Sequence, residues 1–183
     1  MDIPQLKGCH AEFLPQPDAE YGHDPHCVRV HPLNPDRLHQ QNPCGIYRLD
    51  RPERRWERIE THMPQKIGDI GFPLLLDHRN PENLRVFPMD GGSVWPQVCP
   101  GGKPAAYCSR NGGSSWTRQD SGFHRSQAWW TVRRQGMTSN HYDPIGLYFR
   151  HHEWGGLGSR NEVAKWSCLV RHLPEIYSLE VML

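Results

Sequence analysis

The sequence predicts an all-β protein, a partial β-propeller of about three four-stranded antiparallel blades, and three observations support this prediction. Segments that end in tryptophan recur along the chain, and a turn built on Asn-Pro or Asp-Pro recurs upstream of them. Short aliphatic or aromatic runs lie between these turns, as expected for short strands. Third, we find no convincing amphipathic helix, because the 3.6-residue apolar period is not sustained in any segment.

The tryptophan segments align with one another. "YCSRNGGSSW" ends at Trp116 and "LGSRNEVAKW" ends at Trp166, with Ser, Arg and Asn in the same columns. "YRLDRPERRW", which ends at Trp56, keeps the interval from Tyr to Trp. Beyond the tryptophan, "WERIETHMP" and "WSCLVRHLP" share an aliphatic residue, a histidine and a proline at matching places. Such self-similarity predicts one supersecondary unit copied three times.

A second landmark divides the units into strands. Asn34-Pro35, Asn80-Pro81 and Asp143-Pro144 each follow a short apolar run, and such dipeptides favour turns. The middle unit contains a Pro/Gly-rich insertion at 88–104. We expect blades at roughly 23–66, 67–124 and 125–175, preceded by an irregular lead-in at 1–22 and followed by a strand at 176–183.

The stretch "SRNGGSSW" is predicted to be a tight hairpin corner rather than a linker. Asn111 can bond backbone amides further along the turn, and Gly113 tolerates a positive φ. Ser109 and Ser115 can join the two strands through their hydroxyls. Trp116 then points into the layer between adjacent blades, where burial of the indole contributes roughly 2–4 kcal/mol.

This pattern resembles the Asp-box, or BNR repeat, which is found in sialidase-type and sortilin-type propellers and in bacterial BNR-repeat glycosyl hydrolases and photosystem-assembly-factor-like proteins. Ser109, Asn111, Gly113, Ser115 and Trp116 fit it, with Asn for Asp and Ser for Thr. The third unit keeps three of the five residues and has Val163 where glycine is expected, whereas the first keeps little beyond its tryptophan. Their remaining box residues are Ser159, Asn161, Trp166 and Trp56. The resemblance implies that these residues are structural and lie at the blade periphery.

Composition excludes several classes of function. The net charge is +1, without a basic stripe, so neither nucleic acid nor a membrane is an expected partner. The chain has no apolar run long enough for a membrane span and no recognisable signal peptide, which predicts a cytoplasmic location. The six cysteines form no C-x-x-C pair and are expected to be reduced, and no cofactor is predicted.

The candidate binding loop is "YGHDPHCVRVH", which precedes an innermost strand. Propeller ligands bind at the mouth of the central channel, so a polar cluster there can line a ligand site. The candidate ligand-binding residues are His23, Asp24, His26 and Arg29. A metal site is a weaker interpretation because the spacing matches no zinc signature, and a solvated loop is the simplest alternative.

A sialidase-type mechanism would need three arginines, a tyrosine nucleophile and two carboxyl groups. Residues of the right types are present, although nothing in the sequence brings them together: Arg29, Arg133, Arg134, Tyr21, Tyr142, Glu12, Asp24 and Asp69. The run from His151 to Glu153 is expected to be exposed charge.

Three functions remain open. The chain is a sialidase-like glycosyl hydrolase that acts on or binds a glycan, a noncatalytic propeller that binds a glycan or a protein, or an inactive truncated remnant. Because closed propellers have about four to eight blades, three blades predict either missing N-terminal blades or self-association. No catalytic residue is assigned.

Overall fold

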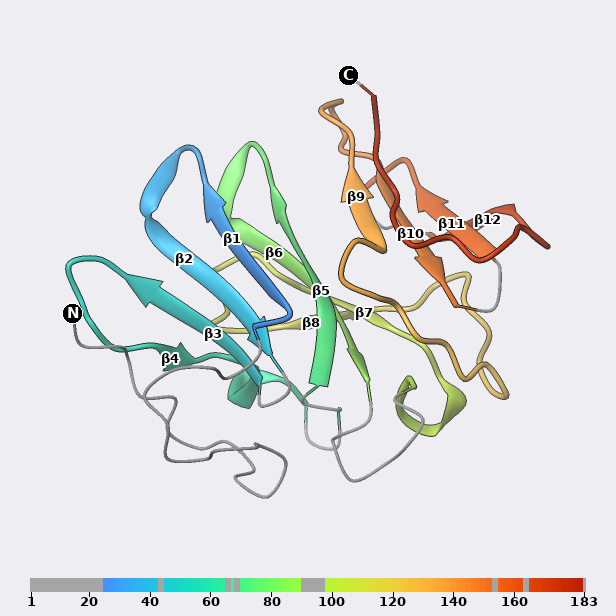
Figure 1. Cartoon of the computed structure of the whole chain (residues 1–183), viewed down its shortest axis with the longest axis horizontal. Helices are drawn as coiled ribbons and strands as arrows, with labels where there is room; N and C mark the ends of the chain where they lie inside the picture. Colours follow the sequence, from blue (N-terminus) through green and yellow to red (C-terminus); the bar gives the residue numbers. More distant parts are fainter. Residues whose placement is uncertain are drawn as a thin grey trace.

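Three four-stranded antiparallel sheets make up the described part of the chain, which confirms the predicted fold class (Figure 1). The computed structural model describes residues 25–42, 45–64, 67, 70–89, 98–152, 155–162 and 165–182. Blade 1 consists of β1 (Cys27–His31), β2 (Asn34–Asn42), β3 (Gly45–Asp50) and β4 (Glu57–Arg58). Blade 2 consists of β5 (Ile70–Asp77), β6 (Asn80–Met89), β7 (Ala106–Ser109) and β8 (Thr117–Gln119). Blade 3 consists of β9 (Met137–Ser139), β10 (Leu147–His151), β11 (Gly155–Ser159) and β12 (Ser167–Val170).

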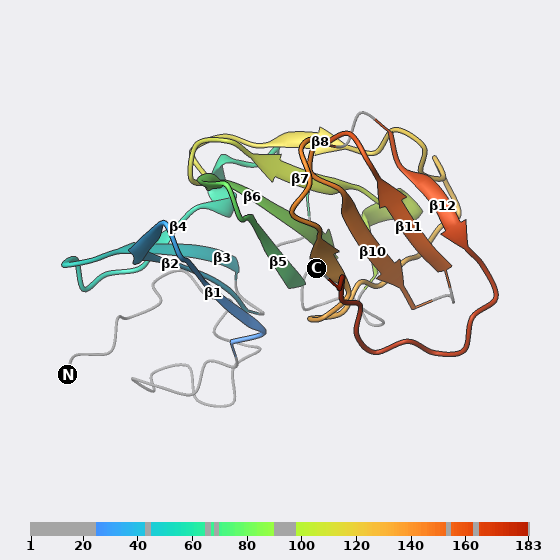
Figure 2. The same ribbon diagram turned by 90° about the horizontal axis from the view of Figure 1, so that it is seen from above.

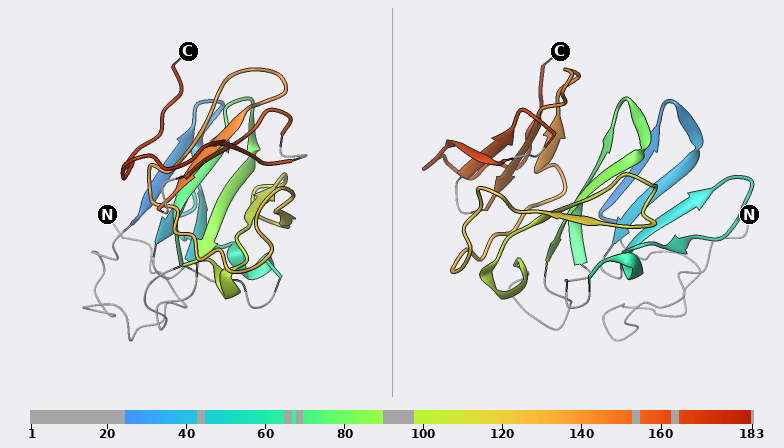
Figure 3. Two further views of the ribbon diagram at one scale, coloured as in Figure 1. Left: turned by 90° about the vertical axis from the view of Figure 1, so that its right-hand side faces the viewer. Right: turned by 180° about the vertical axis from the view of Figure 1, so that it is seen from behind.

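Within each blade the hydrogen-bonded strands follow one another in chain order. β1 contacts β5, and β5 contacts β9, so the first strand of every blade is its innermost strand. Figure 2 shows β5 and β9 near the middle of the molecule and β8 and β12 toward its outer edge. The views from the side and from behind in Figure 3 show the same arrangement of neighbouring sheets. The connector from blade 1 to blade 2 contains the 3-10 turn η2 (Glu60–His62), and an irregular connector leads from blade 2 to blade 3. A second 3-10 turn, η3 (Pro100–Gly102), lies within blade 2 between β6 and β7.

The tryptophans that define the sequence repeat occupy equivalent places. Trp56, Trp116 and Trp166 each come directly before the fourth strand of a blade. Two of them bond to the preceding blade: Trp116 Nε1 donates to the Ile59 carbonyl oxygen at 3.1 Å, and Trp166 Nε1 donates to the Gln119 carbonyl oxygen at 3.2 Å. The repeat read from the sequence is therefore the repeat of the fold.

The hydrophobic core lies between blades rather than within them. A first cluster joins blades 1 and 2 and contains Cys27, Ile46, Ile59, Leu74, Leu84, Val86, Ala105, Tyr107 and Trp116. A second cluster joins blades 2 and 3 and contains Phe87, Cys99, Ala106, Phe123, Ala128, Trp130, Val132, Met137, Ile145, Leu147, Phe149, Leu157 and Trp166. Because side chains alternate across a strand, β6 supplies Leu84 and Val86 to the first cluster and Phe87 to the second.

Charged side chains reinforce both junctions. Arg37 of blade 1 binds Glu82 of blade 2. At the second junction, Arg79 of blade 2 binds Asp143 at 2.7 Å and Glu162 at 2.8 Å, both in blade 3. These contacts fix the relative positions of neighbouring sheets through exposed or half-buried ion pairs.

The segment after blade 3 continues toward the inner strands. Residues 176–182 lie where a further strand was predicted, and there the described chain makes an isolated parallel bridge between Ser178 and Gln135. Gln135 lies two residues before β9. The chain therefore returns from the outer strand β12 to the innermost strand of the same blade.

Candidate functional site

The predicted binding loop meets blade 2. His23 and Asp24 lie outside the described residues. The Nδ1 atom of buried His26 lies 2.8 Å from the Gly71 carbonyl oxygen, and Arg29 Nε donates to the Leu74 carbonyl oxygen at 3.2 Å. The structure therefore uses their polar atoms at the junction between β1 and β5, and a ligand role for them stays a prediction.

Two more side chains of β1 extend this junction. The Nε2 atom of His31 lies 2.7 Å from the Asp77 carbonyl oxygen, and Cys27 Sγ lies 3.8 Å from that of Leu74. The odd-numbered residues of β1, which are Cys27, Arg29 and His31, therefore all face blade 2. This alternation accounts for the polar cluster without any ligand.

The described residues named for a sialidase-type mechanism come from separate elements, with Arg29 on β1. Arg133 and Arg134 precede β9, whereas the exposed Tyr142 lies on the turn after it, so the arginines and the phenol flank opposite ends of that strand. The Arg134 guanidinium lies 6.0 Å from the Phe72 ring centroid. The remaining tyrosine and acids named for this mechanism lie outside the described residues: Tyr21, Glu12, Asp24 and Asp69.

The Ser109–Trp116 corner is closed by side-chain hydrogen bonds. Ser109 Oγ accepts from the Gly113 amide at 2.8 Å and donates to Asn111 Oδ1 at 3.0 Å. Asn111 Oδ1 also accepts from the Ser115 amide, and Asn111 Nδ2 donates to Ser115 Oγ, both at 2.9 Å. Gly113 has a φ of 94°, and a Cβ there would lie 2.5 Å from Ile59 Cδ1. Only glycine therefore suits this turn against blade 1.

The described residues of the third unit keep the contact between the serine and the asparagine of this corner. Ser159 Oγ donates to Asn161 Oδ1 at 3.1 Å. Ser109 makes the same hydrogen bond to Asn111 in the second unit. Val163, which replaces the glycine, lies outside the described residues. The first unit keeps the tryptophan, and Trp56 is half-buried at the outer end of blade 1.

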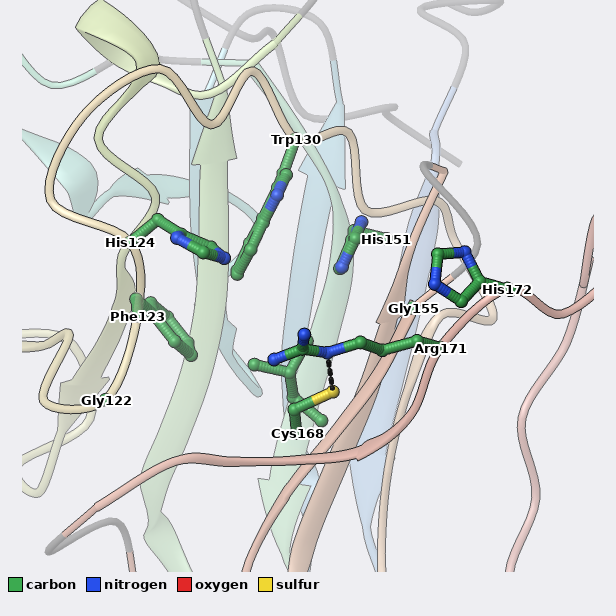
Figure 4. Close-up of a pocket in the computed structure, with 10 residues that line it drawn as sticks. Gly122, Phe123, His124, Trp130, His151, Gly155, Cys168, Arg171 and His172 are labelled. Atoms are coloured by element: carbon green, nitrogen blue, oxygen red, sulfur yellow. Dashed lines mark hydrogen bonds between the residues drawn. The ribbon is translucent and has the colours of Figure 1, made fainter.

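A pocket of about 320 Å³ lies beside blade 3 and is the candidate functional site (Figure 4). One wall is the connector from β8 to β9, and the other is formed by β11, β12 and the residues that follow. The described lining comprises Gly122, Phe123, His124, Trp130, His151, Gly155, Leu157, Cys168, Arg171 and His172. None of these ten residues is acidic.

Stacked rings hold the connector against blade 3. The Trp130 and His151 rings are parallel, with centroids 4.2 Å apart and planes 2° apart. Phe123 and His124 meet Trp130 edge-on, at 5.4 Å and 5.8 Å. His151 is thus buried, which corrects the expectation of exposed charge at this position. Gly155 leaves room for it, because a Cβ there would lie 2.4 Å from His151 Nε2.

The mouth of the pocket is cationic and polar. The exposed Arg171 donates from Nε to Cys168 Sγ at 3.2 Å, which orients its guanidinium over the pocket (Figure 4). His172 lies next to it and His124 lies on the opposite wall. A guanidinium with free donors and two exposed imidazoles suits an anionic or hydroxyl-rich ligand.

Sequence reasoning missed this pocket because its walls lie far apart in the chain. "QAWWTV", which contains Trp130, and "CLVRH", which contains Arg171, look unrelated until blade 3 folds against the connector. The described residues include no group of three His, Cys, Asp or Glu that could hold a metal ion. Within the same residues, no helix is long and apolar enough to cross a membrane.

In the described chain, the three four-stranded sheets lie side by side with their first strands innermost. This arrangement defines a partial β-propeller. Several solved structures resemble it, two GH74 enzymes among them. A GH74 xyloglucanase from Xanthomonas campestris matches with a TM-score of 0.61 and 18% identity, over 80% of this chain and 20% of that one. An ancestral GH74 enzyme matches with a TM-score of 0.58 and 15% identity, over 78% of this chain and 18% of that one.

At these identities the likeness shows the fold alone. The chain spans about a fifth of the length of either enzyme. No family model matches the sequence, and no curated protein matches it. Membership of the Asp-box family, which the motifs implied, is therefore not shown, whereas the propeller fold is.

Proposed function

We propose that this chain forms part of a β-propeller that binds an acidic glycan, and that the pocket beside Trp130 holds the sugar without hydrolysing it. The supporting observation is the composition of the described lining, which has aromatic rings, imidazoles and one guanidinium but no carboxylate. A uronic or sialic acid offers a carboxylate to Arg171 and an apolar ring face to the aromatic wall.

The absence of acids from the described lining argues for binding rather than hydrolysis. Glycosidic bond cleavage ordinarily needs two carboxyl groups that flank the bond. At the blade junctions several described carboxylates are already engaged, because Arg79 binds Asp143 and Glu162, and Arg37 binds Asp50 and Glu82. These acids therefore serve the fold.

The structural neighbours favour a carbohydrate over other ligand classes. One of them is a xyloglucanase and both are GH74 enzymes, so this fold is compatible with glycan recognition. Two alternatives follow from the sequence: a glycoside hydrolase of sialidase type, and a noncatalytic propeller whose ligand is a protein. The experiment below separates each of them from the proposal.

The test is a binding measurement on the full chain with three oligosaccharide probes: an oligogalacturonide, a sialyllactose and a neutral xyloglucan oligosaccharide. Isothermal titration should give binding of at least one acidic probe and a weaker signal with the neutral one. Arg171→Ala should lower the affinity for the acidic probe by about 10- to 100-fold, since it removes a charge-assisted hydrogen bond. Arg125→Ala, an exposed arginine of the same connector outside the lining, is the matched control.

Four results would overturn the proposal. Equal affinity for acidic and neutral probes, or no effect of Arg171→Ala, would show that the cationic mouth does not recognise an acidic ligand. Release of reducing sugar or of an aryl group from a glycoside substrate would instead establish a hydrolase. Absence of binding to all three probes would leave a protein ligand as the better hypothesis.

A further inference from the structure

A second pocket, here called the proline pocket, lies between blade 2 and the connector that leads into it from blade 1. Its volume is about 280 Å³. The described lining comprises Pro64, Ile67, Pro88, Pro100, Lys103, Ala105, Tyr107 and Arg118. The proline pocket thus takes one wall from the connector after η2 and the other from β6, β7, β8 and the segment before β7.

The proline pocket and the pocket beside Trp130 occupy the same place in the repeat. Three positions line both: eleven and nine residues before the aligned tryptophan, and two residues after it. In blade 2 these positions hold Ala105, Tyr107 and Arg118. In blade 3 they hold Gly155, Leu157 and Cys168. The fold therefore forms a pocket at each of the two described junctions, and the side chains at these positions determine what each pocket can bind.

The walls of the proline pocket are apolar. Pro64, Pro88 and Pro100 supply much of the lining, and a proline has no backbone N–H to donate. Ala105 belongs to the hydrophobic cluster between blades 1 and 2, and Ile67 packs against that cluster. Because such walls offer few hydrogen-bond donors to hydroxyl groups, the pocket suits a ligand with an apolar body rather than a sugar.

Polar groups meet at one side of the proline pocket. Arg118 Nη1 donates to the Tyr107 hydroxyl at 3.3 Å, and Arg118 Nη2 donates to the Lys103 carbonyl oxygen at 3.4 Å. Tyr107 is only 3% exposed, and burial raises the pKa of its hydroxyl, so the phenol keeps its proton at neutral pH. Since the phenol oxygen already accepts from Arg118, its proton can be donated to a ligand.

This side of the proline pocket is also cationic. Arg118 and the exposed Lys103 carry positive charges, and the described lining contains no acid. Asp120, outside that lining, binds Arg118 Nε at 2.7 Å and so fixes the orientation of the guanidinium. An ammonium, a guanidinium and a phenol at one rim match the oxygens of a single carboxylate.

We propose that the proline pocket binds a small carboxylate with an apolar body, such as an arylalkanoate. The carboxylate lies at Lys103, Tyr107 and Arg118, and the apolar body lies among the prolines. This site is separate from the pocket beside Trp130, where aromatic rings and imidazoles replace the prolines. It does not depend on the proposed binding of a glycan.

The test is a titration of the isotope-labelled full chain with 3-phenylpropionate, followed through the backbone amide signals in NMR spectra. Saturable shifts are expected at Lys103, Ala105, Tyr107 and Arg118. The neutral 3-phenylpropanamide lacks the charge, and galacturonate replaces the apolar body by hydroxyl groups. Each should shift these amides only at concentrations at least about 10-fold higher.

Two substitutions test the polar side of the proline pocket. Lys103→Met removes the ammonium but keeps an apolar side chain, and it should lower the affinity for 3-phenylpropionate by about 5- to 20-fold. Tyr107→Phe keeps the buried ring and removes the phenol, which should lower the affinity by about 3- to 10-fold. Lys165→Met, at an exposed lysine outside the lining, is the matched control and should leave the affinity unchanged.

The amide spectrum of each variant shows whether it is folded, so a loss of binding can be separated from a loss of structure. Absence of shifts at the four amides up to about 10 mM probe would overturn the proposal, since that limit is weaker than ordinary ligand binding. Equal affinity for the acid and its amide, or shifts confined to residues around Trp130, would overturn it too. The same holds if neither Lys103→Met nor Tyr107→Phe changed the affinity.

Discussion

Two buried polar side chains occupy the same position in consecutive repeats. His39 lies five residues after Asn34, and Arg85 lies five residues after Asn80. Among the described residues, neither ring nitrogen of His39 has a hydrogen-bond partner, and none of the three guanidinium nitrogens of Arg85 has one. A buried polar group without a partner lowers stability. Stability should therefore respond strongly to replacement at these two positions.

His39 makes stability depend on pH. Burial first, and then the positive charges of Arg37 and Arg48, lower the pKa of His39 to about 4, from 6.5 in an unfolded chain. Between pH 6.5 and 4 the unfolded chain takes up a proton that the folded chain excludes. The contribution of neutral His39 to the free energy of unfolding is fully present above pH 6.5. It is lost as the pH falls to 4, and this loss is about 3 kcal/mol at most.

Replacement of His39 by leucine should flatten this pH dependence. His39→Leu keeps an apolar side chain of similar size in the core and removes the group that titrates. The free energy of unfolding, measured by urea denaturation from pH 7.5 to 4, should fall less steeply in the variant than in the natural chain. At pH 7.5 the variant should be at least as stable, because no unpaired ring nitrogen is then buried.

The control for this experiment is His124→Leu, which replaces an exposed histidine at the pocket mouth. That variant should follow the natural chain through the whole pH range. If His39→Leu and the natural chain lost stability in parallel between pH 6.5 and 4, other groups would be responsible for the acid sensitivity.

The asparagines of the two hairpin corners differ in the hydrogen bonds they make to described residues. In the second blade Asn111 bonds Ser109, the Ser115 amide and the Ser115 hydroxyl, whereas in the third blade Asn161 bonds Ser159. Asn111→Ala should therefore lower the free energy of unfolding by about 1–3 kcal/mol, because it removes the acceptor of both the buried Ser109 hydroxyl and the Ser115 amide. Chemical denaturation of the full chain measures this loss.

Asn161→Ala is the matched substitution in the third blade. It removes fewer hydrogen bonds and should cost about 1 kcal/mol or less. Equal losses in the two variants would show that the side-chain bonds of the corner contribute little, and that the buried indole alone stabilises it.

Local patterns were sufficient to predict the strands. The Asn-Pro and Asp-Pro turns do begin or precede the second strand of each blade, and each aligned tryptophan precedes a fourth strand. These features depend on backbone preferences of a few neighbouring residues, which a sequence displays directly. The alignment of three units then identified the propeller because each unit is one complete sheet.

The candidate site could not be predicted in the same way. A histidine and arginine cluster before an inner strand has the same sequence whether it faces a ligand or the next blade, and His26 and Arg29 face carbonyls of β5. The pocket needs Trp130 and His151 to stack across a connector, which is a tertiary contact. Neither side chain alone differs from an ordinary core or surface residue.

The assembled molecule behaves as a short repeat array because its cores are shared between neighbours. Leu84 belongs to the cluster between blades 1 and 2, and Phe149 to the cluster between blades 2 and 3. Blade 2 contributes to both, and β6 is buried on its two faces. In such arrays stability is approximately the sum of units and of nearest-neighbour interfaces. Damage to one interface should therefore remain local.

Paired core substitutions test this locality. Phe149 is fully buried and its ring lies 5.0 Å from that of Trp166, so Phe149→Ala should cost about 3–5 kcal/mol. Hydrogen exchange followed by mass spectrometry should accelerate in β9–β12 and in the connector, and much less in β1–β4. Leu84→Ala, at an equally buried position, should cost about 2–5 kcal/mol and accelerate exchange in blades 1 and 2 instead. If both variants accelerated exchange uniformly, the three blades would unfold as one cooperative unit, and the shared cores would not divide the chain into separable interfaces.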